Sequence, residues 1–151
     1  MPDGYCNGVN LSVQTLTSAC WPVEATPAVN LPEPLKSCVQ SFETFYDSVT
    51  RARVLHWVHN VGAVTMTAHF TEQKLELVMS ALQAAVLLQF NAKTRMTVAA
   101  LGKELGLAPY IVKLQLRSLV SGPVPLLIKE PSSGYAPDHV LRYARTTAAT
   151  L

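Results

Sequence analysis

Hydrophobic and polar residues alternate near the start of the chain, in the stretch "GVNLSVQTLTSACWPV". Val9, Leu11 and Val13 occupy every second position, and the residues between them are polar. A period of two is typical of a half-buried strand. Trp21-Pro22 is expected to end the strand, because proline cannot donate a hydrogen bond to a ladder. The pattern therefore predicts a strand with almost no chain in front of it that could act as its partner.

The period changes to that of a helix after the proline-rich connection "VEATPAVNLPEP". From Pro34, apolar residues at helical spacing predict an amphipathic helix to about Ser48. Three strand-like runs follow, separated by turn signals: "RVLHWVH", "AVTMTAHF" and "KLELVMS". In the second and third runs apolar and polar residues alternate. We expect an antiparallel meander with one apolar and one polar face.

Helical patterns fill most of the chain after Ser80. The stretch "ALQAAVLLQFN" is apolar nearly all round and is expected to be buried on several sides. Thr97 is a suitable N-cap for a second helix that ends at Gly106. Pro109 suits the first turn of a third helix, through about Val120. The runs "PLLIKE" and "HVLRYA" then flank the turn "PSSG". Three helices followed by a small hairpin are typical of a winged helix.

These elements predict an α+β fold, in which an antiparallel sheet with a packed helix is followed by a winged-helix domain. The α/β subdomain is expected over residues 1–80 and the winged helix over 81–145, with 146–151 as a frayed tail. The apolar helix that begins at Ala81 is expected to hold the two subdomains together.

Composition adds one hint about function. Hydrophobic residues make up 49% of the chain and charged residues 15%, which excludes a disordered, highly charged segment and suggests that a partner covers part of the surface. A net charge of +2 is too small to indicate nucleic-acid or membrane binding by itself. No apolar run reaches the ~20 residues of a membrane span, and the opening residues do not resemble a signal peptide.

No metal, cofactor or catalytic group is predicted. The three cysteines, Cys6, Cys20 and Cys38, lack a disulfide spacing and suit a reducing compartment, the cytoplasm or the nucleus. His56 and His59 form an H-x-x-H motif, but on a strand they would point to opposite faces and could not share a zinc ion. The sequence contains no G-x-S-x-G, P-loop or G-x-G-x-x-G motif. Enzyme activity in this chain alone is therefore not expected.

Five segments together resemble the cullin family. They are "NLSVQTLTSACWP", "LPEPLKSCVQSFETFY", "RVLHWVHNVGAV", "ELVMSALQAAVLLQFN" and "LRSLVSGPVPLLIKEPSSG", in the family's order from about Gly8 to Tyr143. Each motif alone is weak, because it consists mostly of core residues, but five in register are specific. The chain is similar to the cullin homology region, its α/β part plus the first winged helix. The residues expected to form the core of these motifs are Phe42, Phe45, Tyr46, Leu55, Trp57, Leu87 and Phe90.

The resemblance implies a non-catalytic scaffold of a multisubunit RING-type ubiquitin ligase. Cullins hold a RING-box protein, which adds a strand to their α/β sheet, and the full-length complex brings together a conjugating enzyme (E2) and a substrate adaptor. An open sheet edge is suited to strand addition, because it offers unpaired N–H and C=O groups. The residues expected next to the added strand are Val9, Leu11, Val13, Thr15 and Trp21. The alternative for Val9, Leu11 and Val13 is an ordinary internal strand, and the sequence does not show which edge is open.

Other interpretations stay open at this point. The cullin-like subunit of the anaphase-promoting complex shares the same homology region. A winged-helix nucleic-acid-binding module would use the helix from Pro109, which offers Lys113 and Arg117 on one face, fewer cations than a DNA reader normally presents. A pure oligomerisation module is a third alternative. The adaptor-binding helical repeats and the second winged helix of the family are missing, so the chain is expected to be either a fragment of a longer protein or a reduced family member. A strand that opens just after Met1 favours the fragment.

Overall fold

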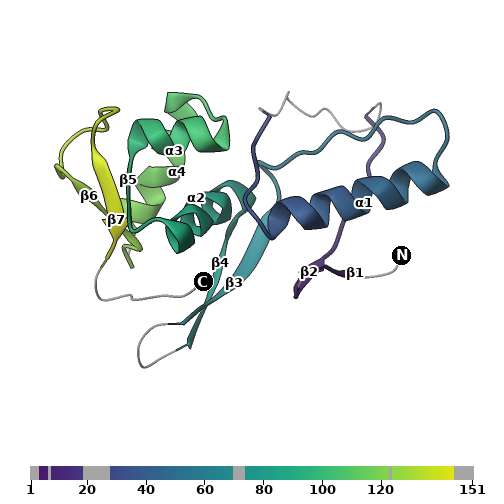
Figure 1. Cartoon of the computed structure of the whole chain (residues 1–151), viewed down its shortest axis with the longest axis horizontal. Helices are drawn as coiled ribbons and strands as arrows, with labels where there is room; N and C mark the ends of the chain where they lie inside the picture. The colour runs from purple at the N-terminus through teal and green to yellow at the C-terminus, as the bar shows by residue number, and fades with distance from the viewer. Residues whose placement is uncertain (1–3, 7, 19–27, 70–73, 123, 145–151) are drawn as a thin grey trace.

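The computed structural model describes residues 4–6, 8–18, 28–69, 74–122 and 124–144. Within these residues an α/β part precedes a winged-helix part, so the predicted α+β class is confirmed (Figure 1). The elements are, in order, β1 (Gly4–Cys6), β2 (Val9–Leu11), α1 (Leu35–Val49), β3 (Ala63–His69), β4 (Lys74–Ser80), α2 (Ala81–Ala92), β5 (Arg95–Thr97), α3 (Val98–Leu105), α4 (Pro109–Ser121), β6 (Leu127–Glu130) and β7 (Val140–Tyr143).

The first strand of the chain is not the one that the sequence predicts. β1 and β2 form a short antiparallel hairpin with Gly4 opposite Leu11, so the predicted strand does have a partner in front of it. Gly8 has φ 82 in the turn, a left-handed conformation that favours glycine. β2 ends at Leu11, which lies opposite Gly4, the first residue of β1. The predicted end at Trp21-Pro22 lies outside the described residues.

The long helix α1 forms as predicted and carries a cluster of aromatic side chains. Phe42 is buried, and its ring meets the Trp57 ring edge-on at a centroid distance of 5.6 Å. The segment that contains Trp57 was expected to be the strand Arg53–His59, which is wrong, because the structure assigns no strand there. Ala52 starts the segment with φ 60, and Trp57 then packs on α1. Aromatic packing on a helix thus takes the place of ladder pairing.

The hairpin β3–β4 matches its prediction closely. The two strands pair antiparallel from Ala63 opposite Ser80 to His69 opposite Lys74. Because directly opposed residues share a face, one face is apolar and the other mostly polar. The expected three-stranded meander is thus a two-stranded sheet within the described residues, since the first of its three runs is not a strand.

The main hydrophobic core lies in the winged-helix part. α2 is buried on several sides, as its apolar sequence predicts, with Leu82, Ala84, Ala85, Val86, Leu87 and Phe90 buried. Ser80 caps the helix through a capping box: its hydroxyl accepts from the Gln83 N–H, and its own N–H donates to the Gln83 side chain. Thr97 caps α3 and Gly106 ends it with φ 67, as predicted. α4 begins at Pro109 and ends at Ser121.

The wing contains one more strand than the sequence predicts. β6 and β7 form the expected hairpin, and β5 pairs with β7 to give the strand order β5-β7-β6. β5 has only three residues, "RMT", and is too short to show a periodic pattern. Tyr143 of β7 joins the sheet to α2: its hydroxyl donates to the Leu87 carbonyl at 3.0 Å, and its ring meets Phe90. Burial raises the pKa of Tyr143.

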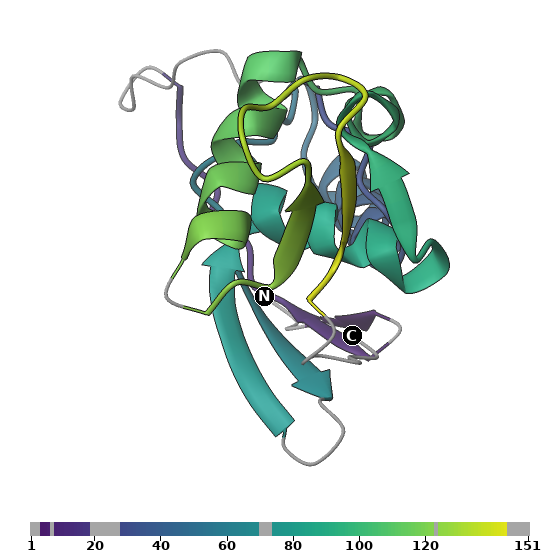
Figure 2. The ribbon, with the colours of Figure 1, turned by 90° about the vertical axis from the view of Figure 1, so that its left-hand side faces the viewer.

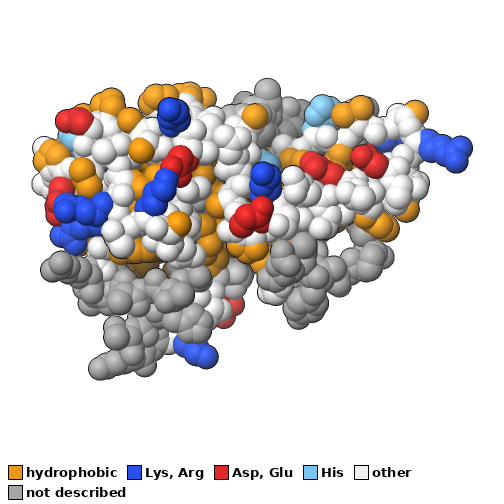
Figure 3. All heavy atoms as spheres, viewed as in Figure 1, with side chains coloured by type: hydrophobic (Ala, Val, Ile, Leu, Met, Phe, Trp, Pro, Cys, Tyr) orange, Lys and Arg blue, Asp and Glu red, His pale blue; other side chains and the backbone are white. Residues whose placement is uncertain are grey.

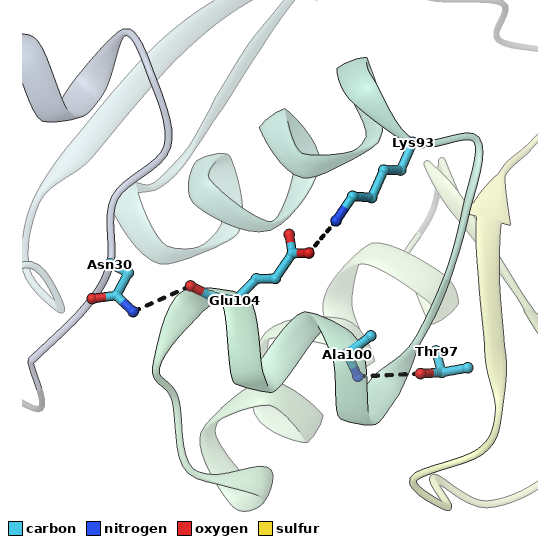
Figure 4. A network of polar contacts seen from close by, with 5 residues as sticks. All are labelled: Asn30, Lys93, Thr97, Ala100 and Glu104. Carbon is cyan, nitrogen blue, oxygen red and sulfur yellow. Dashed lines mark hydrogen bonds and ion pairs between the residues drawn. The ribbon is translucent and has the colours of Figure 1, made fainter.

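Hydrogen bonds tie the two parts together. The Asn30 backbone N–H donates to the Leu105 carbonyl at 2.9 Å, and the Asn30 side chain donates to the Glu104 carbonyl (Figure 4). The Glu104 carboxylate also pairs with Lys93, so the end of α3 is joined to the end of α2 as well. These contacts connect the segment before α1 to the winged helix.

Candidate partner-binding surface

Two short hairpins lie on the same side of the molecule. β1–β2 and β3–β4 are both in the lower half of Figures 1 and 2, below α1 and α2. Among the described residues each is a separate two-stranded sheet, and the two do not pair with each other. A two-stranded ribbon has an unpaired outer edge on each strand, where N–H and C=O groups can pair with another strand. This arrangement makes the hairpins the candidate site for an added strand.

The apolar face of β3–β4 is only partly covered. It consists of the opposed pairs Val64–Met79, Met66–Leu77 and Ala68–Leu75. Ala68 is buried, but Leu75 is 41% exposed and most of the others are half-buried. On the opposite face Val78 is 73% exposed. A partner could therefore bury apolar side chains here as well as pair with an edge.

The residues predicted to lie beside a partner strand are only partly in β2. Val9 and Leu11 belong to it, and both are half-buried. Val13 is half-buried and Thr15 is exposed, but the structure assigns neither to a strand. The alternation of burial nevertheless continues through Gln14, so the backbone beyond β2 keeps the side-chain pattern of a strand. Trp21 lies outside the described residues.

The residues predicted to form the core of the motifs differ in burial. Leu87 and Phe90 are buried in the main core, and Phe42 is a buried residue of α1. Tyr46, Leu55 and Trp57 are half-buried. Phe45 is 37% exposed, so it does not belong to the core of the described residues. Its place on α1, three residues after Phe42, turns it toward the edge of the aromatic cluster.

Sequence reasoning missed several exposed apolar side chains in the α/β part. Val49 at the end of α1 is 59% exposed, and Val54 and Val61 on either side of Trp57 are 79% and 75% exposed. Hydrophobic side chains are visible on the surface at several places in Figure 3. A one-dimensional pattern assigns such residues to the core, because it does not show that Trp57 packs the extended segment on α1 while these valines stay exposed.

The wing provides few cations for nucleic acid. Lys113 and Arg117 are both exposed on α4, as predicted. However, Arg95 and Arg142 of the wing sheet both pair with Glu130, and these pairs lower the pKa of the Glu130 carboxyl, with Arg142 contributing most. Lys129 is 3% exposed, and its ammonium donates to the backbone carbonyls of the loop that follows. These wing cations are therefore occupied within the protein.

Neither metal-site geometry nor a membrane helix is found in the described parts of the chain. No three His, Cys, Asp or Glu side chains there are close enough together to hold a metal ion. His59 instead stacks on the Trp57 ring at 6.0 Å between centroids. Burial lowers the pKa of His59, and the nearby Glu43 carboxylate opposes this shift. None of the described helices is long and apolar enough to cross a membrane.

Comparison with known proteins gives a consistent match. A family model described as the cullin alpha+beta domain matches residues 15–146. The chain is 36% identical over 126 residues to a putative cullin-like protein 1 of Arabidopsis thaliana, which covers 83% of this chain and 18% of that protein. It is 32% identical over 137 residues to Cullin-1 of Oryza sativa subsp. japonica, covering 90% of this chain and 18% of that protein. It is 30% identical over 122 residues to Cullin-3 of Dictyostelium discoideum, covering 81% of this chain and 16% of that protein. The chain thus spans less than a fifth of the length of these curated relatives.

Proposed function

The chain belongs to the cullin family, and we propose that it acts as part of a non-catalytic scaffold in a multisubunit RING-type ubiquitin ligase. In this proposal its α/β part binds a RING-box protein, which contributes a strand to the sheet. The RING-box protein in turn positions the E2 that carries ubiquitin. The substrate adaptor would be held elsewhere in the full-length complex.

One observation carries the proposal of strand addition. Two hairpins lie on the same side of the molecule without pairing to each other in the described part of the chain, and the apolar face of one is partly exposed (Figure 1). An extended segment of a partner would satisfy edge N–H and C=O groups and cover Leu75 and its neighbours. The strand-like burial of Val13, which is in no described strand, supports an extended partner near β2.

The proposed mechanism is positional. A scaffold accelerates ubiquitin transfer by keeping the loaded E2 close to a bound substrate, which raises the effective concentration of the two reacting groups. Such a scaffold must be stiff, since a flexible one would lower that concentration. The hydrogen bonds from Asn30 to the end of α3 and from the Ala81 N–H to the Gly62 carbonyl, at 2.9 Å, support a rigid connection between the two parts.

Co-expression with a RING-box protein, followed by size-exclusion chromatography, tests this function. We expect an equimolar complex, with more soluble chain than expression alone gives. Deleting the N-terminal strand of the RING-box protein should abolish co-elution, because that segment supplies the paired backbone. A monomer that elutes separately from the intact RING-box protein would contradict the proposal.

A further inference from the structure

The winged-helix part contains a pocket of about 560 Å³, separate from the two hairpins. It lies between α3, the start of α4 and the loop that joins β6 to β7; that loop is the yellow-green segment at the top of Figure 2. This volume falls within the range of sites that bury much of a small ligand or several side-chain atoms. The pocket is lined by Val98, Ala99, Gly102, Lys103, Gly106, Leu107, Pro109, Tyr110, Val112, Lys113, Tyr135 and Pro137.

The pocket combines a buried apolar part with an exposed polar part. Val98, Leu107 and Val112 are buried, so their side chains are held in place by the core. Tyr110 is 74% exposed, and Lys103 is exposed too. An apolar side chain that enters the pocket would therefore meet a preformed surface and lose its contact with water.

The charged side chains that line the pocket have one sign. The lining contains Lys103 and Lys113 and no carboxylate. Lys113 extends over the Tyr135 ring, with its ammonium 6.0 Å from the ring centroid, and Arg117 follows one turn later on α4. Within the described residues the ion pairs involve Lys93, Arg95 and Arg142, whereas Lys103, Lys113 and Arg117 form none.

We propose that this pocket binds an acidic segment of a partner protein. The segment inserts one apolar side chain between α3, α4 and the wing loop, and its carboxylates pair with Lys103 and Lys113. Two observations lead to this chemistry: the apolar lining calls for an apolar anchor, and the unpaired lysines call for negative charge beside it. Leu114, 64% exposed on the same face of α4 as Tyr110, extends the apolar surface.

Nucleic acid fits this surface less well than an acidic peptide. A duplex needs a line of free cations along its phosphates, and the wing cations Arg95, Arg142 and Lys129 are held by Glu130 or by backbone carbonyls. The exposed apolar groups on this face of α4, Tyr110 and Leu114, would also lie against phosphates. These two side chains contribute more to the binding free energy when they are buried against the apolar side chains of a peptide.

Fluorescence anisotropy with labelled synthetic peptides tests the proposal on the whole chain. The probes are Glu-rich peptides with one central Leu, Phe or Trp, the same peptides with Ser in place of that residue, and a DNA duplex. We expect at least one anchored peptide to bind, and its Ser counterpart to bind at least about tenfold more weakly, because the buried anchor is lost. Ala99→Trp, which fills the pocket from an exposed position on α3, should weaken the anchored peptide by a similar factor.

Matched charge variants distinguish binding at the pocket from non-specific electrostatic attraction to the whole protein. The double variant Lys103→Glu, Lys113→Glu should abolish peptide binding. The double variant Lys36→Glu, Arg51→Glu changes the net charge equally at exposed positions of the α/β part and should leave binding unchanged. Three results would overturn the proposal: no anchored peptide binds, the Ser peptides bind as well as the anchored ones, or the duplex binds more tightly than the peptides. Circular dichroism of each variant shows whether the fold is kept.

Discussion

The indole N–H of Trp57 donates a hydrogen bond of 2.8 Å to the Glu43 carboxylate on α1. The same ring meets Phe42 edge-on and stacks on His59. One side chain therefore fastens the extended segment between α1 and β3 to the helix, where the sequence pattern predicts a strand. The position of β3, and with it the β3–β4 hairpin, depends on this contact, because β3 begins only a few residues later.

Removing the hydrogen bond should lower stability measurably. Glu43→Leu leaves the half-buried indole N–H without its acceptor, and we expect the free energy of unfolding to fall by about 1–2 kcal/mol. Glu43→Gln keeps a side-chain oxygen as acceptor and should cost less than about 0.5 kcal/mol. Urea unfolding followed by circular dichroism measures both values. Equal losses in the two variants would mean that the hydrogen bond does not hold the segment.

Stability should depend on the protonation of His59. Burial lowers its pKa below the ordinary value of 6.5, so the folded protein favours the neutral ring. Above that pH the imidazole is neutral in both the folded and the unfolded protein, so His59 does not make the free energy of unfolding depend on pH. As pH falls below it, the unfolded chain binds a proton first, so the free energy of unfolding decreases until the folded pKa is passed. Urea unfolding at a series of pH values measures the slope, and His59→Gln should remove this contribution.

Glu43 provides a second check on the same histidine. Its carboxylate raises the pKa of His59 against the larger effect of burial. Glu43→Gln removes that negative charge, so the pKa of His59 should move further down, as NMR titration of the imidazole signals would show. An upward shift would contradict the assignment of Glu43 as the neighbouring charge.

The sequence predicts the helices better than the sheet, for physical reasons. The winged helix is built from local signals, such as the caps Ser80 and Thr97 and the left-handed Gly106, each of which acts within one turn. The β3–β4 pair is also local, since its alternating residues lie within one stretch of sequence. These elements could be predicted because neighbouring residues determine them.

The errors concern pairing between distant segments. β1 and β5 have three residues each and no period to recognise, so nothing in the sequence indicates that they pair. Arg53–His59 has strand-like composition, but Trp57 finds its partners on α1. For the candidate site, the alternation around Val13 is visible in the sequence, while the separation of the two hairpins is visible only in three dimensions.

Each of the two N-caps of the winged helix should contribute measurably to the free energy of unfolding. Ser80 accepts from the Gln83 N–H at 3.2 Å, and Thr97 accepts from the Ala100 N–H at 3.1 Å. Ser80→Ala and Thr97→Ala should each lower the free energy of unfolding by about 1 kcal/mol, because a helix N–H loses its acceptor. Ser121→Ala, at the exposed end of α4, is the matched control and should stay within about 0.5 kcal/mol of the parent. Thermal unfolding measures all three.

Replacing Gly106 by alanine should destabilise the fold for two separable reasons. It has φ 67, and a Cβ added there would lie 3.1 Å from the Asn30 side-chain nitrogen. Gly106→Ala should therefore cost about 1–2 kcal/mol of stability. The cost should be smaller in an Asn30→Ala background, where the crowding is relieved, and a double-mutant cycle measures the difference. Gly8→Ala, with φ 82 and no described atom beyond its chain neighbours within 4 Å of the added Cβ, isolates the conformational cost. Strict additivity of Gly106→Ala and Asn30→Ala would show that the contact does not matter.

The last prediction concerns how a partner strand would pair beyond β2. Successive N–H groups of an extended chain point to opposite edges, so an added strand can accept from Val13 or from Gln14 but not from both. Neither residue is in a described strand, so proline at either position removes no ladder bond of the described fold. Val9 and Leu11 are paired to β1, so in an extended continuation the Val13 N–H points to the β1 side and the Gln14 N–H to the outer edge. We expect Gln14→Pro to abolish RING-box co-elution and Val13→Pro to retain it, with unchanged circular dichroism in both. If Gln14→Pro is folded and still binds, the partner strand does not pair at Gln14. An outer edge of β3–β4, whose apolar face is partly exposed, would then be the place to introduce the next prolines.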